Sequence, residues 1–180
     1  MITTDIERVL ITEEEIEKRC VELAEEIEKY YNEKKEIPMV IGLLKGSVPF
    51  MAELIKRFTF GCVIDFMSVS SYEGTTSTGD VRIDKDTDIS VKGRSVLVVE
   101  DIVDTGRTLK AVRELLYYRG ATDVKIVSLL NKPDRRVVDI EADYVGFTIP
   151  NEFVVGYGLD YNQVYRNLPY IGVLKEEIYE

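Results

Sequence analysis

The sequence predicts an α/β protein with a doubly wound, mainly parallel sheet that is flanked by helices. Three short apolar runs, at residues 39–44, 96–99 and 124–130, are rich in Val, Ile and Leu, as is typical of strands buried on both faces of a parallel sheet. Segments with helical spacing of their apolar residues separate these runs, and parallel strands need such crossover connections. Ligands of such sheets bind at the carboxyl ends of the strands, so functional residues are expected there.

Length and composition fit a single domain over residues 1–180. The chain has 180 residues and is 45% hydrophobic, which is enough for an ordinary core. Its net charge of −10 argues against nonspecific binding to nucleic acid. There is no histidine, which excludes Ser-His-Asp and Cys-His catalysis and zinc sites built on imidazole. A general base must then be a carboxylate, Lys, Tyr or Cys.

The cysteines and the lack of long apolar runs predict a cytoplasmic protein with no membrane partner. Cys20 and Cys62 lie in apolar patterns, which favours buried thiols over a disulfide. No signal peptide, transit peptide or 18-residue apolar run is present.

The first helix is predicted from a capping box at residues 12–15, where Thr12 is followed by three glutamates. Its apolar face consists of Ile16, Cys20, Leu23, Ala24 and Ile27. The opposite face is rich in Glu and Lys and is expected to be solvated, so we assign this helix to packing.

A second strand–loop–helix unit begins with the strand 39–44, which Pro38 precedes. Lys45-Gly46-Ser47 follow the strand, and the next helix has Val48, Met51, Leu54, Ile55 and Phe58 on one face. By pattern alone, the Lys-Gly pair fits a tight turn with an exposed lysine as well as it fits a functional loop.

The next strand is predicted at residues 62–69 and leads into Ser70-Ser71-Tyr72. Residues 73–80 are small and polar with almost no apolar anchors, which indicates a mobile loop. Val81 to Ile83 are expected to pair back against the preceding strand as a hairpin, and Gly93 marks the turn before the central strand.

The central stretch reads V-L-V-V-E-D-I-V-D-T-G-R-T over residues 96–108. A buried strand, a short polar loop and a helix N-terminus form a cradle for anions there, because loop N–H groups and the helix dipole converge. The helix ends at Gly120, a typical C′ glycine. Gly106 lets the backbone come close to a phosphate, and Thr105 and Thr108 add hydroxyl donors. The adjacent acids at 100 and 101 suit ribose hydroxyls or a hard cation such as Mg²⁺.

The pattern changes after the strand 124–130. Residues 131–136 read N-K-P-D-R-R and on their own indicate a charged turn. From Tyr144 onward the chain has no helical period and many aromatic residues, which predicts a small irregular or β-rich subdomain beside the sheet.

Residues 96–108 resemble the signature for phosphoribosyl pyrophosphate (PRPP) of the type I phosphoribosyltransferases: an apolar run, two acids, two apolar residues, then D-T-G-x-T. L-K-G at 44–46, S-S-Y at 70–72, the lysine after strand 124–130 and F-V-V-G-Y-G-L-D-Y-x-x-x-Y-R-N-L-P at 153–169 are similar to the hypoxanthine-guanine members of that family. The resemblance implies the type I phosphoribosyltransferase fold, with a core at about 36–135 and a small hood subdomain from the N-terminal segment and about 140–180.

The implied activity is purine salvage: transfer of the 5-phosphoribosyl group from PRPP to hypoxanthine or guanine, giving IMP or GMP and pyrophosphate, with Mg²⁺. The resemblance also implies small-molecule substrates and a homodimer or homotetramer, with no nucleic-acid partner. A xanthine-preferring relative is the alternative within the enzyme class. A PRPP-responsive regulator that binds RNA or DNA is the alternative outside it, and the negative charge disfavours that reading. A Rossmann dehydrogenase is disfavoured because no G-x-G-x-x-G follows a predicted strand.

The resemblance further assigns roles to individual residues. Asp104 is placed to accept the purine N7 proton as a general base. PRPP and its 5′-phosphate would be bound by Glu100, Asp101, Asp104, Thr105, Gly106, Arg107 and Thr108. The pyrophosphate would be bound by Lys45, Gly46 and Arg166, and the peptide between Leu44 and Lys45 is expected to be cis. The purine would be bound by Lys132, Phe153 and Val154. Ser71 and Tyr72 would belong to a lid with residues 73–80, and the metal ligands would be Glu100 and Asp101 for one Mg²⁺ and Asp160 for a second.

Overall fold

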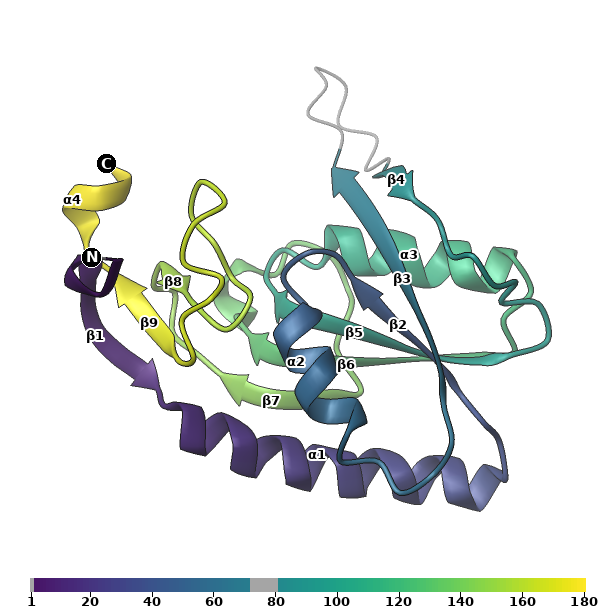
Figure 1. Ribbon diagram of the computed structural model, residues 1–180. Coiled ribbons are helices and arrows are strands. Elements are labelled where there is room, and N and C mark those ends of the chain that lie inside the picture. Colours follow the sequence, from purple (N-terminus) through teal and green to yellow (C-terminus); the bar gives the residue numbers. More distant parts are fainter. Residues whose placement is uncertain (1, 72–80) are drawn as a thin grey trace.

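The computed structural model describes residues 2–71 and 81–180, and for Ser71 the backbone alone. Its main element is a six-stranded sheet with the strand order β4-β3-β2-β5-β6-β7 (Figure 1). These strands are β2 (Met39–Leu43), β3 (Val63–Ser71), β4 (Val81–Lys85), β5 (Ser95–Val103), β6 (Asp123–Asn131) and β7 (Tyr144–Thr148). All neighbours pair in parallel except β4, which is antiparallel to β3. The mainly parallel sheet and the 81–83 hairpin are therefore confirmed.

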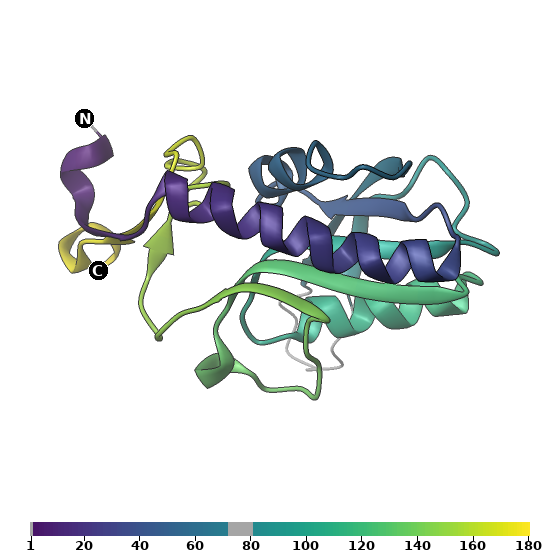
Figure 2. The same cartoon turned by 90° about the horizontal axis from the view of Figure 1, so that it is seen from below.

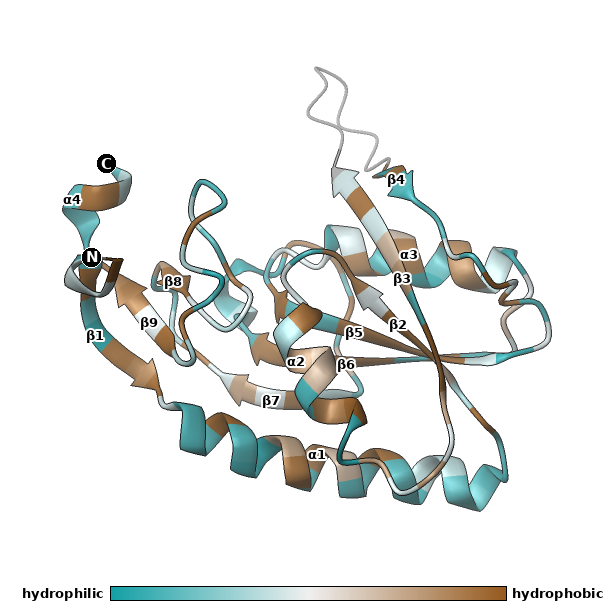
Figure 3. Ribbon diagram, viewed as in Figure 1, coloured by the Kyte–Doolittle hydropathy of each residue, from teal (hydrophilic) through white to brown (hydrophobic). Residues whose placement is uncertain are grey.

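Helices cover both faces of this sheet (Figures 1 and 2). On one face, α1 (Glu13–Lys34) and α2 (Val48–Ile55) pack against side chains such as Leu97 and Val99. On the other face, α3 (Arg107–Tyr118) packs against the alternate residues Val96 and Val98. The uninterrupted apolar run of β5 follows from this arrangement, because both faces of the strand are buried. Figure 3 shows the same pattern as continuous brown along the start of β5.

The first helix has the predicted features. Thr12 and Glu15 form the capping box, with the Glu15 N–H donating to Thr12 Oγ1 at 3.3 Å and the Thr12 N–H donating to Glu15 Oε2 at 2.8 Å. The predicted apolar face is buried in full: Ile16, Cys20, Leu23, Ala24 and Ile27. Figure 3 shows the opposite, outer face of α1 as mainly hydrophilic.

A second, three-stranded sheet forms the hood. It has the order β1-β9-β8, with β1 (Ile6–Ile11), β9 (Ile171–Leu174) and β8 (Val154–Val155), and all its pairs are antiparallel. The short helices η1 (Ile2–Asp5) and α4 (Glu176–Tyr179) flank it, and the chain ends meet at this tip of the molecule (Figure 1). A further short helix, η2 (Pro133–Arg135), follows β6.

Three expectations from the sequence need correction. Residues 144–147 were expected in the hood, but β7 pairs with β6 and extends the large sheet. The central strand was expected to end at Val99, but β5 continues through the acids to Val103 because β6 pairs with it along that length. The second helix ends at Ile55 rather than reaching Phe58. Val48 is 41% exposed, and Phe50, which the spacing missed, is buried in its place.

Both cysteines are free thiols, as expected, but only Cys20 is buried, and Cys62 is partly exposed. Cys20 is fully buried in the core, and burial raises the pKa of its thiol to about 12. Among the described residues, no helix has the length and apolar character needed to cross a membrane. The cytoplasmic location stays a prediction.

Replacing Thr12 with Ala is expected to lower Tm at neutral pH by about 2–6 °C, because α1 loses its N-cap. The hydrogen bonds from Thr12 also lower the pKa of Glu15. A carboxylate with a lower pKa in the folded state contributes stability above its unfolded pKa, and this contribution is lost as the pH falls. The deficit should therefore shrink below about pH 4.

Thermal unfolding of the Thr12→Ala variant at neutral and acidic pH measures both effects. Lys18→Ala, an exposed change on the same helix, is the control. A deficit that grows on acidification would contradict the assigned role of the capping box.

Candidate active site

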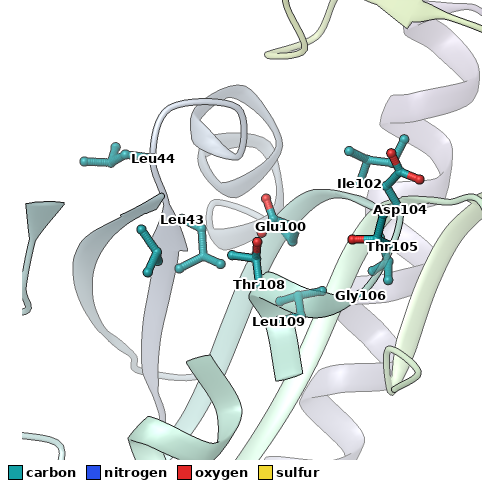
Figure 4. Close-up of a pocket in the computed structure, with 11 residues that line it drawn as sticks. Leu43, Leu44, Glu100, Ile102, Asp104, Thr105, Gly106, Thr108 and Leu109 are labelled. Carbon is teal, nitrogen blue, oxygen red and sulfur yellow. The ribbon is translucent and has the colours of Figure 1, made fainter. Parts of the chain in front are cut away.

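The predicted site residues gather where β2, β5 and β6 end and the hood begins. A cavity of about 240 Å³ lies there. Residues from the end of β5 and the following loop surround it (Figure 4). Its lining comprises Leu43, Leu44, Val69, Glu100, Ile102, Val103, Asp104, Thr105, Gly106, Thr108 and Leu109. Asp101 lies outside this lining, and Arg107 is exposed at the start of α3.

The loop between β5 and α3 has the form of an anion cradle. Gly106 is the N-cap residue of α3 and has φ 82°, a left-handed conformation that favours glycine. A Cβ atom there would lie 2.4 Å from Ile140 Cγ2, so the position also has no room for a side chain. Gly106 makes no side-chain cap, and the Arg107 N–H has only a long contact of 3.5 Å to Thr105 Oγ1, so this helix N-terminus can present N–H groups to an anion.

The acids Glu100 and Asp101 lie on the β5 strand beside this cradle. The Asp101 N–H donates to Glu100 Oε1 at 3.1 Å, and the Ile102 N–H donates to Asp101 Oδ1 at 2.8 Å. Burial and the neighbouring Asp101 carboxylate raise the pKa of Glu100 well above its usual value. A bound cation would offset the repulsion between the two adjacent carboxylates.

The Lys45–Gly46 loop lies against the acids. The peptide bond between Leu44 and Lys45 is cis, as expected from the resemblance. A Cβ atom on Gly46 would lie 1.6 Å from Asp101 Oδ2, so the loop backbone is in direct contact with that carboxylate. The predicted pyrophosphate loop and the predicted sugar-binding acids are thus adjacent.

The same loop also touches the hood. A Cβ atom on Gly158, which has φ 103°, would lie 1.9 Å from the Gly46 carbonyl oxygen. Gly46 is therefore held between the Asp101 side chain and the Gly158 backbone. Lys45 Nζ donates to Gln163 Oε1 at 3.2 Å, which adds a side-chain link between the loop and the hood.

Arg166 and Asp160 form an ion pair above the Lys45–Gly46 loop, with 2.8 Å between Arg166 Nη2 and Asp160 Oδ1. Arg166 also donates to the Gly158 carbonyl oxygen at 2.7 Å. Asp160 Oδ2 accepts from the Gln163 N–H at 2.8 Å. The three predicted charged residues, Lys45, Asp160 and Arg166, are thus connected through Gln163, which the sequence did not single out.

The backbone of Asp104 accepts a hydrogen bond from one arginine, and its side chain forms an ion pair with another. Arg136 donates to the Asp104 carbonyl oxygen, and the Val137 N–H donates to the next carbonyl, that of Thr105, at 3.1 Å. Arg135 Nε lies 2.8 Å from Asp104 Oδ1, and the side chains of the two residues are 50% and 38% exposed. The segment N-K-P-D-R-R therefore contains two arginines that contact the cradle. From the sequence alone, this segment was interpreted as a charged turn.

The predicted purine-binding residues lie close together, because Lys132 contacts the residue that precedes Phe153 and Val154. Lys132 is 7% exposed, and its ammonium donates to the Glu152 carbonyl oxygen at 2.7 Å. Burial lowers the pKa of Lys132, and the Asp104 carboxylate partly opposes this effect. Glu152 immediately precedes Phe153, which is 39% exposed, and Val154, which is buried in β8.

The lid is the part of the predicted site that this arrangement does not include. The lid, with Tyr72 and residues 73–80, lies outside the described residues, and of Ser71 only the backbone in β3 is described. Within the described residues, no group of three or more Asp, Glu or Cys side chains could hold a metal ion without other ligands.

Comparison with known proteins matches this fold and site. A model of the phosphoribosyl transferase domain matches residues 10–162. The chain is 55% identical to the hypoxanthine-guanine phosphoribosyltransferase of Streptococcus pyogenes serotype M3, over 99% of each chain. It is 59% identical to that of Lactococcus lactis subsp. lactis, over 97% of this chain and 94% of the relative. A crystal structure of a hypoxanthine phosphoribosyltransferase from Staphylococcus aureus superimposes with a TM-score of 0.93 at 53% identity, covering 99% of this chain and 97% of that one.

These matches define the class first: an enzyme with the type I phosphoribosyltransferase fold, which the sequence predicted. Within that class, the sequence identity of 55–59% over nearly the whole length of both chains determines the family. The chain belongs to the hypoxanthine-guanine phosphoribosyltransferase family.

Proposed function

We propose that the protein transfers the 5-phosphoribosyl group of PRPP to hypoxanthine or guanine, with release of pyrophosphate and formation of IMP or GMP. One observation carries this proposal: the anion cradle, the Lys45–Gly46 loop and the Lys132–Phe153 region converge at one edge of the sheet. A phosphorylated sugar, a diphosphate and a planar base therefore have adjacent places. The names of the relatives support the choice of substrates.

The 5′-phosphate would lie against the first turn of α3, where Thr105, Gly106 and Thr108 offer N–H and hydroxyl donors. Arg107 starts the same turn and adds a positive charge near the phosphate. Glu100 and Asp101 would hold the ribose hydroxyls, because carboxylates accept hydrogen bonds from them. These assignments are supported by the geometry of the cradle.

The leaving pyrophosphate would be held by Lys45, the Gly46 backbone and Arg166. Breaking the C1′–O bond builds positive charge on the sugar and negative charge on the leaving group. The two cationic side chains would neutralise the latter, and Asp104 would accept the N7 proton of the incoming purine. Phe153 would stack on the base, and the backbone of Val154 would pair with its edge.

Mg²⁺ fits the residues present. Proteins bind this ion through one or two carboxylates together with substrate phosphates rather than in an all-protein cage. Glu100 with Asp101, and separately Asp160, offer such partial sites. When bound, the ion would supply positive charge beside the diphosphate. Family resemblance also supports a homodimer or homotetramer.

Pyrophosphate release from PRPP, measured with each of four bases in turn, tests the proposed function. Hypoxanthine and guanine should give turnover and adenine at least tenfold less, with EDTA abolishing activity, and xanthine tests the alternative of a xanthine-preferring enzyme. The base preference follows from the buried Lys132 donor. Equal rates with adenine, or turnover on xanthine alone, would contradict the assigned substrates.

A further inference from the structure

Phe153 has an aromatic neighbour from the far end of the chain. The Tyr179 ring of α4 lies on it in a stacked arrangement, with 4.7 Å between ring centroids and 17° between ring planes. Tyr161 meets Phe153 edge to face, at 5.7 Å and 87°. With both neighbours in place, Phe153 is still 39% exposed, so part of the ring remains open to a ligand.

Two distant parts of the chain meet at Phe153 and the residue before it. Lys132 reaches the Glu152 carbonyl from the core. In both views α4 lies at the tip of the hood, on the side away from the six-stranded sheet (Figures 1 and 2). The helix that carries Tyr179 therefore lies at the tip of the hood, whereas Lys132 reaches the residue before Phe153 from the end of β6.

We propose that Tyr179 is a positioning residue for the purine: it backs the Phe153 ring and fixes the plane on which the base stacks. This inference rests on the proposed function. Tyr179 does not touch the base and takes no part in the chemistry. Its effect passes through Phe153 alone.

The start of α4 is fixed firmly enough for this role. The Leu174 N–H, just before α4, donates to the Phe153 carbonyl oxygen at 2.9 Å. The Lys175 N–H donates to the Asp5 carbonyl oxygen at 3.0 Å, which ties the same segment to the end of η1. Tyr179 and Ile178 also pack against the small hood cluster around Val155 and Leu174. The backbone and side chain of Phe153 are thus both held by the segment that carries Tyr179.

Loss of the Tyr179 ring should affect binding of the base more than any other step. Stacked aromatic pairs contribute enough to change an equilibrium by about 3- to 10-fold. PRPP would bind at the β5–α3 loop and the Lys45–Gly46 loop, and within residues 2–71 and 81–180 no backbone hydrogen bond joins α4 to either loop. We therefore expect Tyr179→Ala to raise KM for hypoxanthine by about 3- to 10-fold, while kcat and KM for PRPP change less than about twofold.

Steady-state kinetics of the full chain with hypoxanthine and PRPP test this expectation. Tyr179→Phe keeps the ring and should behave like the parent. Glu177→Ala, an exposed change on the same short helix, should also leave all constants unchanged. An unchanged or lower KM for hypoxanthine in Tyr179→Ala would overturn the inference, as would equal changes in KM for both substrates or a Phe variant that behaves like Ala.

A double-mutant cycle distinguishes an effect of Tyr179 that passes through Phe153 from a general loss of structure in the hood. If Tyr179 acts through Phe153, Tyr179→Ala should have little further effect on KM for hypoxanthine in a Phe153→Leu background. Additive effects would overturn the inference while the proposed function stood. A parent protein that releases no pyrophosphate with any base would instead overturn the proposed function, and this inference with it.

Discussion

Replacing Asp104 with Asn is expected to lower kcat with hypoxanthine by about 10²–10⁴-fold, the loss typical of a missing general base. The change keeps the shape of the side chain and removes its ability to accept a full proton. The backbone of the cradle should stay in place, because Arg136 bonds to the Asp104 carbonyl oxygen and not to its side chain. KM for PRPP should therefore change much less than kcat.

The pair with Arg135 does not weaken this expectation. Both side chains are substantially exposed, and an ion pair of that kind contributes little to stability. Asp134→Asn is the matched control, since Asp134 is an exposed acid in the loop that carries Arg135. An Asp104→Asn variant that bound PRPP normally and turned over at the parent rate would remove Asp104 from the role of base.

Replacing Lys132 with Met is expected to remove most of the preference for hypoxanthine over adenine, through a loss of at least tenfold to a hundredfold in kcat/KM for hypoxanthine. An ammonium group has three donors and no acceptor, so it can donate to the O6 atom of a 6-oxopurine. Opposite the N6 amino group of adenine, it would face another donor. Because Lys132 is buried, that mismatch cannot be relieved by water.

The structure sharpens this prediction. One donor of Lys132 is already used by the Glu152 carbonyl oxygen, which fixes the ammonium next to Phe153. Met keeps the length and apolar stem of the side chain, so the variant tests the charge and its hydrogen bonds. Lys125→Met, a lysine near the opposite end of β6, is the control. If the ratio of kcat/KM for hypoxanthine to that for adenine stayed at the parent level in Lys132→Met, Lys132 would not be the residue that selects the base.

Local patterns predicted most of the fold because each depends on neighbours in sequence. The Thr12 capping box and the buried run of β5 are examples, since a hydrogen bond across three residues and burial on two faces both leave a direct signature. The assignment of residues 144–147 to the hood failed for the opposite reason. Whether a short aromatic strand joins one sheet or another depends on its partner, β6, which periodicity does not reveal.

The candidate site divides in the same way. The residues of the 96–108 stretch could be assigned because their types and order resemble a known signature. Gln163, Gly158 and Arg136 could not, because their contacts with Lys45, Gly46 and Asp104 join distant parts of the chain. The stacking of Tyr179 on Phe153 belongs to this second group, since nothing in the last residues of the sequence indicates an aromatic partner.

The hood sheet also determines when the molecule can become functional during synthesis. β1 precedes the strands of the core sheet in the chain, yet its partner β9 follows them, with Ile11 paired to Ile171. Pairings between such distant segments form slowly, because a long loop must close before they can stabilise it. The core sheet up to β7 has all its strands earlier, while Phe153 is fixed only when β9 pairs with β8. Translation therefore completes the strands that carry the proposed phosphate cradle before the strand β9, whose pairing with β8 holds the proposed base-stacking residue Phe153.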